Sequence, residues 1–179
     1  MASINEQRID NLCISAGFEP KVVQVLTTML LDHYRNGIQT SQLFRFNLDK
    51  DGELNQRCEM RRDFLEAIRL PIEESKEYQD RLFQNLRNCP WMRGLIDIAL
   101  DEIASTFDEG ALYREIITNY YLIDASLTND EIAALVNQSL PSLERKKREA
   151  IKCFGISMYH YAYRRELEES EKNSYVGIK

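Results

Sequence analysis

The sequence predicts an all-α fold. Three observations support this prediction: apolar residues recur at three- and four-residue spacing along most of the chain, helix-capping patterns precede several of these stretches, and helix-breaking residues are rare. The 179 residues include only seven glycines and four prolines. This length fits one domain, or a core with a small appended module.

Two short helices are expected first, at 5–16 and 19–35. Gly17 is placed to end the first helix, since glycine adopts the backbone conformation that commonly follows a helix. Asn36-Gly37 predicts the end of the second helix for the same reason.

The segment 38–54 is less regular. Alternation from Gln42 to Leu48, followed by Asp51-Gly52, predicts one small β-hairpin near 42–55 or, equally, a loop between helices. The stretch 47–58 also resembles a calcium-binding loop. Its last ligand should be a bidentate Glu and is Cys58 instead, so a simple Asp-Gly turn is favoured.

Further helices are expected at 59–70, 72–88, 92–106 and 111–122, with Pro71 opening the second of these. Pro90-Trp91 marks a boundary. We therefore divide the chain into an N-terminal helical region of unknown role at 1–90, a helix-turn-helix domain at 91–167 with a long final helix, and a flexible tail at 168–179.

The segment 126–151 carries the clearest pattern. Thr128 and Glu131 form a capping box, which starts a short helix. Ala133 is small, as two closely crossing helices require. Asn137 stands where the chain needs a left-handed residue, and Ser139 caps the second helix. Two helices joined by such a short turn form a helix-turn-helix.

The second helix of this unit is basic. Four consecutive cations run from Arg145 to Arg148, and the segment 127–165 has seven Lys/Arg against four Asp/Glu in a chain of net charge −6. Amides at a helix N-terminus favour phosphate, and arginine pairs with guanine edges in the major groove. The candidate DNA-binding residues are Ser139, Ser142, Arg145, Lys146, Arg148 and Lys152.

The run Leu127-Thr-Asn-Asp-Glu-Ile-Ala-Ala-Leu, followed by Ser139 and Arg145-Lys-Lys-Arg-Glu-Ala-Ile, resembles region 4 of sigma factors. It is still more similar to stand-alone phage transcriptional regulators of the ArpU/RinA type. The similarity spans roughly 95–163 and is strongest over 127–154. It implies binding to double-stranded DNA, with Ser142, Arg145 and Lys146 contacting bases or phosphates. Gln138, Lys147, Glu144 and Glu149 depart from the usual pattern.

Nothing in the sequence supports catalysis, and we expect neither an enzyme nor a cofactor. The two histidines, His33 and His160, are far apart, and no glycine-rich phosphate loop is present. The four cysteines are scattered without metal-ligand spacing, which predicts free thiols and no metal site. With no signal segment and no membrane-spanning stretch, a soluble cytoplasmic protein is expected.

The leading hypothesis is a sequence-specific double-stranded DNA-binding regulator of transcription, from a bacterium, a phage or another mobile element. The acidic N-terminal region would contact a protein such as RNA polymerase. The alternative is a helical protein–protein interaction module without DNA binding, which burial of Ser142, Arg145 and Lys146 would favour.

The aromatic residues of the last helix, from Phe154 to Tyr163, are expected to pack in the core. The alternative is an exposed stripe used for dimerisation or for a polymerase partner. No heptad seam predicts a dimer, so the sequence leaves the oligomeric state open.

Overall fold

A computed structural model describes residues 3–41, 49–87, 89–123 and 125–176, with only the backbone of 38–41 and 174–176. It confirms the all-α prediction, and the described residues contain no strand. The elements are α1 (Ile4–Ser15), α2 (Pro20–Ser41), α3 (Lys50–Ala67), α4 (Lys76–Leu86), α5 (Met92–Thr106), α6 (Gly110–Ile117), the π-helical turn η1 (Thr118–Leu122), α7 (Asn129–Leu135) and α8 (Leu140–Val176).

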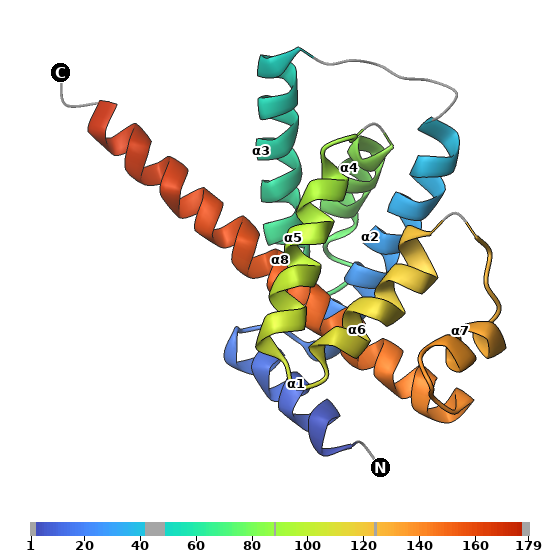
Figure 1. The fold of residues 1–179 in the computed structure, drawn as a ribbon. Coiled ribbons are helices and arrows are strands. Elements are labelled where there is room, and N and C mark those ends of the chain that lie inside the picture. Colours follow the sequence, from blue (N-terminus) through green and yellow to red (C-terminus); the bar gives the residue numbers. More distant parts are fainter. Residues whose placement is uncertain (1–2, 42–48, 88, 124, 177–179) are drawn as a thin grey trace.

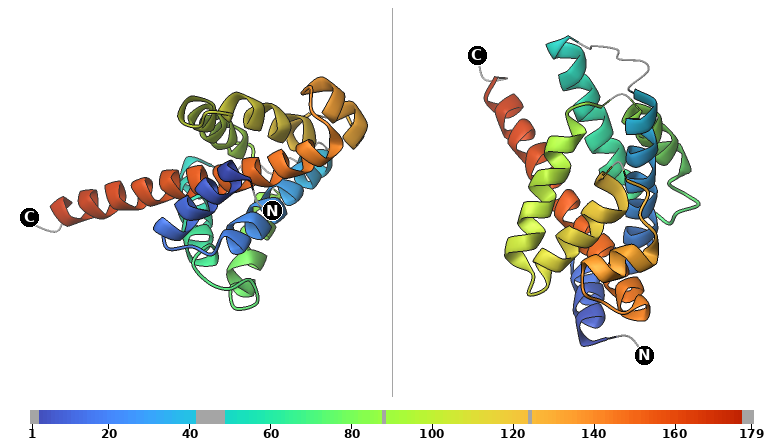
Figure 2. Two further views of the ribbon diagram at one scale, coloured as in Figure 1. Left: turned by 90° about the horizontal axis from the view of Figure 1, so that it is seen from below. Right: turned by 45° about the vertical axis from the view of Figure 1, so that its right-hand side comes forward.

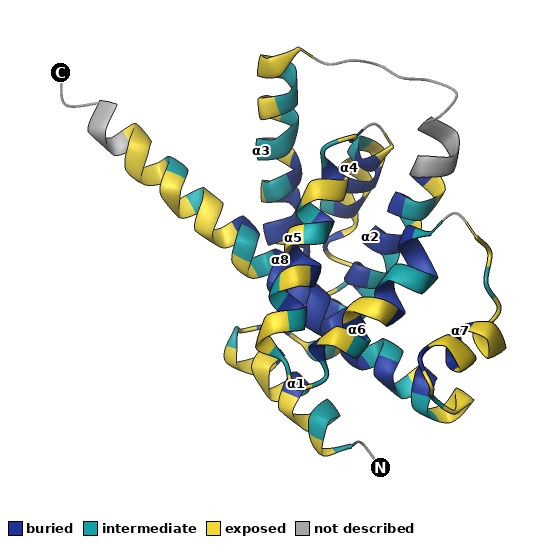
Figure 3. Cartoon of the chain, viewed as in Figure 1, coloured by how far each residue is buried: buried dark blue, intermediate teal, exposed yellow. Residues whose placement is uncertain are grey.

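Helix α8 is the central element of the fold (Figure 1). The helices α1, α2, α3, α5, α6 and α7 all contact it, and Phe154 in its middle is fully buried. Gly155 lets α2 approach closely, because a Cβ there would lie 2.3 Å from the hydroxyl oxygen of Thr27. One hydrophobic core therefore joins residues from both predicted regions, and Figure 3 shows the buried middle of α8 within it.

The predicted end of the second helix at Asn36-Gly37 is wrong, because α2 continues to Ser41. Gly37 is buried, and a Cβ at this position would lie 3.5 Å from the backbone oxygen of Leu86 at the end of α4. Tertiary packing thus keeps the helix intact across a residue pair that ends many isolated helices.

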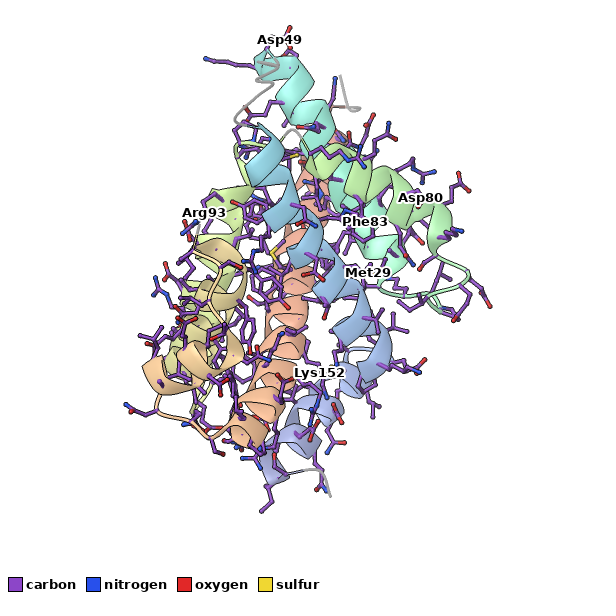
Figure 4. All side chains as sticks on the ribbon, turned by 90° about the vertical axis from the view of Figure 1, so that its right-hand side faces the viewer. Met29, Asp49, Asp80, Phe83, Arg93 and Lys152 are labelled. Carbon is purple, nitrogen blue, oxygen red and sulfur yellow. The ribbon has the colours of Figure 1, made fainter. Side chains whose placement is uncertain are left out.

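The predicted hairpin near 42–55 is wrong in the part that can be seen. Residues 42–48 lie outside the described residues, but Lys50 onward is helical. Asp49 caps α3 by accepting a hydrogen bond of 2.7 Å from the Gly52 N–H, so Asp51-Gly52 belongs to the first helical turn. Asp49 marks this end of α3 in Figure 4.

Boundaries elsewhere were predicted with mixed accuracy. Helix α5 has the predicted limits, whereas α4 begins at Lys76 rather than just after Pro71. The predicted helix 111–122 is α6 followed by η1. Arg35 and Arg93 donate hydrogen bonds to the Tyr120 and Leu122 carbonyls, which the widened turn leaves open.

All four cysteines are free thiols, as predicted. Burial raises the pKa of Cys13 to about 11 and that of Cys89 to about 12, so both stay protonated near neutral pH. Among the helices described, none is both long enough and apolar enough to cross a membrane.

Candidate nucleic-acid interface

The helix-turn-helix consists of α7, a turn at 136–139 and the start of α8. Thr128 and Glu131 form the predicted capping box: the Thr128 hydroxyl accepts from the Glu131 N–H at 3.3 Å, and the Glu131 carboxylate accepts from the Thr128 N–H at 2.7 Å. Asn137 has a φ of 52°, as predicted, and the Gln138 N–H donates to the Ala133 carbonyl at 2.9 Å. The turn is therefore built by local sequence.

The side of the helix-turn-helix that packs against the rest of the protein is apolar. Ile132, Ala133 and Val136 of α7 and the turn are buried, as is Leu143 of α8. Beside them the Lys147 ammonium lies 3.7 Å from the centroid of the Tyr120 ring. Burial lowers the pKa of this lysine, which faces inward as its place in the helix predicted.

Three of the six candidate residues form one row on the outer side, namely Ser139, Ser142 and Arg145. The Ser142 N–H donates to the Ser139 hydroxyl at 3.4 Å, and the Ser142 hydroxyl donates to the Gln138 side-chain oxygen at 2.6 Å. Arg145 is half-buried, and its guanidinium donates one hydrogen bond of 3.5 Å, to the Ser142 hydroxyl. Its Nε is buried from solvent and has no hydrogen-bond partner among the described residues. The Nη groups at the tip of the Arg145 side chain are therefore the donors that can reach a ligand.

Lys146, the residue after Arg145, is turned toward α6 and the loop before it and is only 7% exposed. Its ammonium contacts the carboxylates of Glu109 and Glu149, the latter at 3.0 Å. Glu149 is 0% exposed and also accepts hydrogen bonds of 2.8 Å from Tyr113 and from Ser3. We call Lys146, Glu149, Glu109, Tyr113 and Ser3 the buried polar cluster.

Charges within the buried polar cluster stabilise one another. Burial by itself would lower the pKa of Lys146, but its hydrogen bonds to Glu109 and Glu149 outweigh burial and raise it. Burial would raise the pKa of Glu109, but hydrogen bonds from Lys146 and Asn5 lower it. Both groups are therefore ionised near neutral pH.

Lys152 is also buried, at 4% exposure, and points toward α1 (Figure 4). Its ammonium lies 2.5 Å from Asp10 and 3.8 Å from Glu6, both on α1. Arg148 is intermediate between the buried lysines and the outer row. Its Nε is 3.5 Å from Glu6, yet its side chain is 43% exposed. The structure thus keeps Ser139, Ser142 and Arg145 together at the surface and directs two of the predicted lysines into the body.

The sequence did not point to the partners of these lysines. Glu6 and Asp10 precede Lys152 by more than 140 residues, and Glu109 precedes α6. The one local signal is that Glu6 and Asp10 are four residues apart, which places both carboxylates on the same face of a helix.

The described residues hold no group of three or more His, Cys, Asp or Glu side chains able to bind a metal ion. The helix-turn-helix also carries exposed carboxylates, those of Asp130, Glu131 and Glu144. Comparisons of the chain with protein-family models, with curated proteins and with solved structures give no match.

Proposed function

We propose that this protein binds double-stranded DNA through its helix-turn-helix and serves as a regulator of transcription. The observation that carries the proposal is the geometry of α7, the turn and α8, which sets Ser139, Ser142 and Arg145 in one row. Ser139 is exposed, and Ser142 and Arg145 are half-buried. In such units the second helix enters the major groove with its N-terminal residues toward the bases. The similarity to sigma region 4 and to phage regulators supports the same function.

Each residue of the proposed face has a distinct task. Ser139 and Ser142 lie at the start of α8, where hydroxyls and backbone amides suit phosphate oxygens. Arg145 makes only one long hydrogen bond within the described residues, so the Nη groups of its guanidinium suit a guanine edge or a phosphate. Arg148 joins the face if its contact with Glu6 opens. Lys146 and Lys152 are left out of this face, because their ammonium groups are engaged with carboxylates inside the protein.

The charge around the face sets an expectation for affinity. Few cations are available, and the exposed carboxylates of Asp130, Glu131 and Glu144 repel phosphate. A protein that neutralises about two phosphates has a logarithmic salt slope near −2. We therefore expect modest affinity and a shallow salt dependence, and a sequence preference that depends on Arg145.

The test is the binding of fluorescent duplex DNA from a random pool, followed by anisotropy across a salt series. Wild-type protein is expected to bind, and Arg145→Ala is expected to bind more weakly with a slope shallower by about 1. Lys21→Ala is the matched control, since it removes one exposed cation from α2, which is not part of the helix-turn-helix. Lys146 stays unchanged, because its loss would disturb the fold.

Absence of binding by the wild-type protein at low salt would overturn the proposal. Equal loss of affinity in Arg145→Ala and Lys21→Ala would also overturn it, since it would show only nonspecific attraction between charges.

A second candidate function is a protein–protein interaction module. Two leucines beside the turn, Leu135 and Leu140, are exposed, and the Glu144 carboxylate lies close to them in the sequence. Apolar side chains with a nearby carboxylate suit a protein surface better than DNA phosphates. Leu135→Ser, on α7, should leave DNA binding intact under the first proposal and weaken partner binding under the second.

A further inference from the structure

The C-terminal part of α8 leaves the body of the protein. Figures 1 and 2 show the helix extending past the other elements toward the C-terminus. We call residues 163–176 of α8 the arm. Its 14 residues span about 21 Å at the usual rise of a helix.

One side of the arm is fixed to α3. The Arg61 guanidinium lies 2.9 Å from Glu166 and also contacts Glu169, and Arg62 lies 3.3 Å from Glu166. The hydrogen bond from Arg61 is the main cause of a lowered pKa at Glu169. These contacts fix the rotation of the arm about its own helix axis. The side of the arm that faces away from α3 is therefore turned toward solvent.

The outward side carries apolar groups. Tyr163 is 41% exposed and Leu167 is 47% exposed, and their four-residue spacing puts them on one face. Tyr159 stacks on Tyr163, with ring centroids 5.8 Å apart. Toward the body the same face leads to a hollow of about 280 Å³ between α1, α8 and the connection from α5 to α6, whose lining includes Leu12, Ile156 and His160.

The charges along this face differ at its two ends. Arg164 lies on the side toward the body and Glu171 on the side toward the tip, and both are exposed. Neither makes an ion pair with any residue in the described part of the chain, whereas Arg165 and Glu168 pair with each other at 3.0 Å. A second helix of the same sequence in the opposite direction would set Arg164 against Glu171 twice. A parallel copy would set like charges together.

We propose that the arm is a homodimer surface, on which a second copy of this chain docks its own arm antiparallel. The Leu167 side chains of both copies form the apolar centre, Arg164 and Glu171 form an ion pair on each side of it, and Tyr163 lies just beyond each pair. A two-fold axis makes the surface self-complementary, as an isologous interface requires. The contact is short, so the dimer is weak, in the class of small transient interfaces.

The antiparallel arrangement has a consequence that rests on the proposed function. The helix-turn-helix lies at the opposite end of α8 from the arm, about 40 Å from Leu167 at the helical rise. The two DNA-binding units of a dimer therefore lie on the order of 80 Å apart, far more than the ~34 Å between adjacent half-sites. Such a dimer would bind two DNA sites that lie far apart, and it would not bind both halves of a compact inverted repeat.

The dimer is tested by analytical ultracentrifugation of the full chain over a concentration series, without DNA. Wild type is expected to shift from monomer to dimer as concentration rises. Tyr163→Ser/Leu167→Ser is expected to stay monomeric with an unchanged circular dichroism spectrum, since both side chains are exposed. The control Ile98→Ser removes an equally exposed apolar side chain from α5 and should dimerise like wild type.

Charge exchange tests the direction of pairing. Arg164→Glu and Glu171→Arg should each weaken self-association about tenfold, and an equimolar mixture of the two should restore it, because each then meets an opposite charge. The wild-type dimer should also weaken with salt. A monomer at every concentration overturns the proposal, as does a dimer that Tyr163→Ser/Leu167→Ser leaves unchanged. A failure of DNA binding leaves this result unaffected.

Discussion

Two neighbouring cations of α8 have opposite surroundings. Within the described residues Arg145 makes one side-chain hydrogen bond, of 3.5 Å to the Ser142 hydroxyl, and it lies in the outer row of the helix-turn-helix. Lys146, the next residue, is buried against Glu109 and Glu149. A rotation of about 100° per residue separates a group available to a ligand from a group that holds helices together. Basic character alone therefore does not identify a DNA-binding residue.

The largest expected effect is at the buried polar cluster. Lys146→Met should lower the free energy of unfolding by about 3–5 kcal/mol, because it leaves the fully buried Glu149 without its cation. Arg145→Met removes the same charge one position earlier and should change stability by no more than about 0.5 kcal/mol. Urea denaturation followed by circular dichroism measures both. An equal loss of unfolding free energy in the two variants would show that Arg145 and Lys146 do not differ in their contribution to stability.

The next effect concerns the hydroxyl of Tyr113, which donates to Glu149 at 2.8 Å. Tyr113→Phe should cost about 1.5–3 kcal/mol, the usual range for a hydrogen bond to a charged group. Tyr163→Phe on the exposed arm is the control and should be neutral. The same denaturation experiment compares them, and a neutral Tyr113→Phe would show that the cluster does not depend on this donor.

The buried polar cluster also predicts a pH profile. The pKa of Glu109 is lowered below its ordinary 4.5, so its contribution is present above that value and is lost as pH falls through the lowered pKa. The pKa of Lys146 is raised above its ordinary 10.5, so its contribution is present below that value and is lost as pH rises through the raised pKa.

Stability from this pair should therefore be constant between the two ordinary pKa values and fall on both sides. Glu109→Gln should reduce the acid-side fall, as measured by denaturation midpoints from neutral to acid pH. An acid profile identical to that of wild type would assign the loss of stability to other carboxylates.

Local features of the fold were predictable because neighbouring residues determine them. The capping box of Thr128 and Glu131 and the positive φ of Asn137 depend on a few residues of backbone. The limits of α5 followed from apolar spacing in the same way. These features place the helix-turn-helix without any information about the rest of the chain.

Features that depend on distant segments were not predictable. Gly37 remains helical because α4 lies against it, and Lys152 is buried because α1 supplies Glu6 and Asp10. Apolar periodicity shows that a helix has an inner face, but it does not reveal which carboxylates from elsewhere lie next to that face. The basic run of α8 therefore gave six candidates, and the structure leaves Ser139, Ser142, Arg145 and Arg148 with access to solvent.

The smallest effects are expected on the outer side, where the contacts are local and exposed. Thr128→Ala removes the cap of α7 and should cost about 1 kcal/mol, within the usual range for caps. Because α7 positions the start of α8, the same variant should weaken DNA binding although it removes no charge. Denaturation and the anisotropy assay measure these two effects, and loss of stability with unchanged binding would separate α7 from the DNA face.

Asn137 gives the finest comparison within the turn. Asn137→Gly should be neutral to within about 0.5 kcal/mol, because glycine accepts the observed φ of 52° and loses more backbone entropy on folding. Asn137→Val should cost about 1–2 kcal/mol, because a β-branched side chain is strained in the left-handed region. Denaturation of the two variants side by side distinguishes a backbone requirement from a side-chain contact. If glycine were as destabilising as valine, the turn would depend on contacts of the Asn137 side chain. The left-handed backbone at this position would then not be enough to explain the turn.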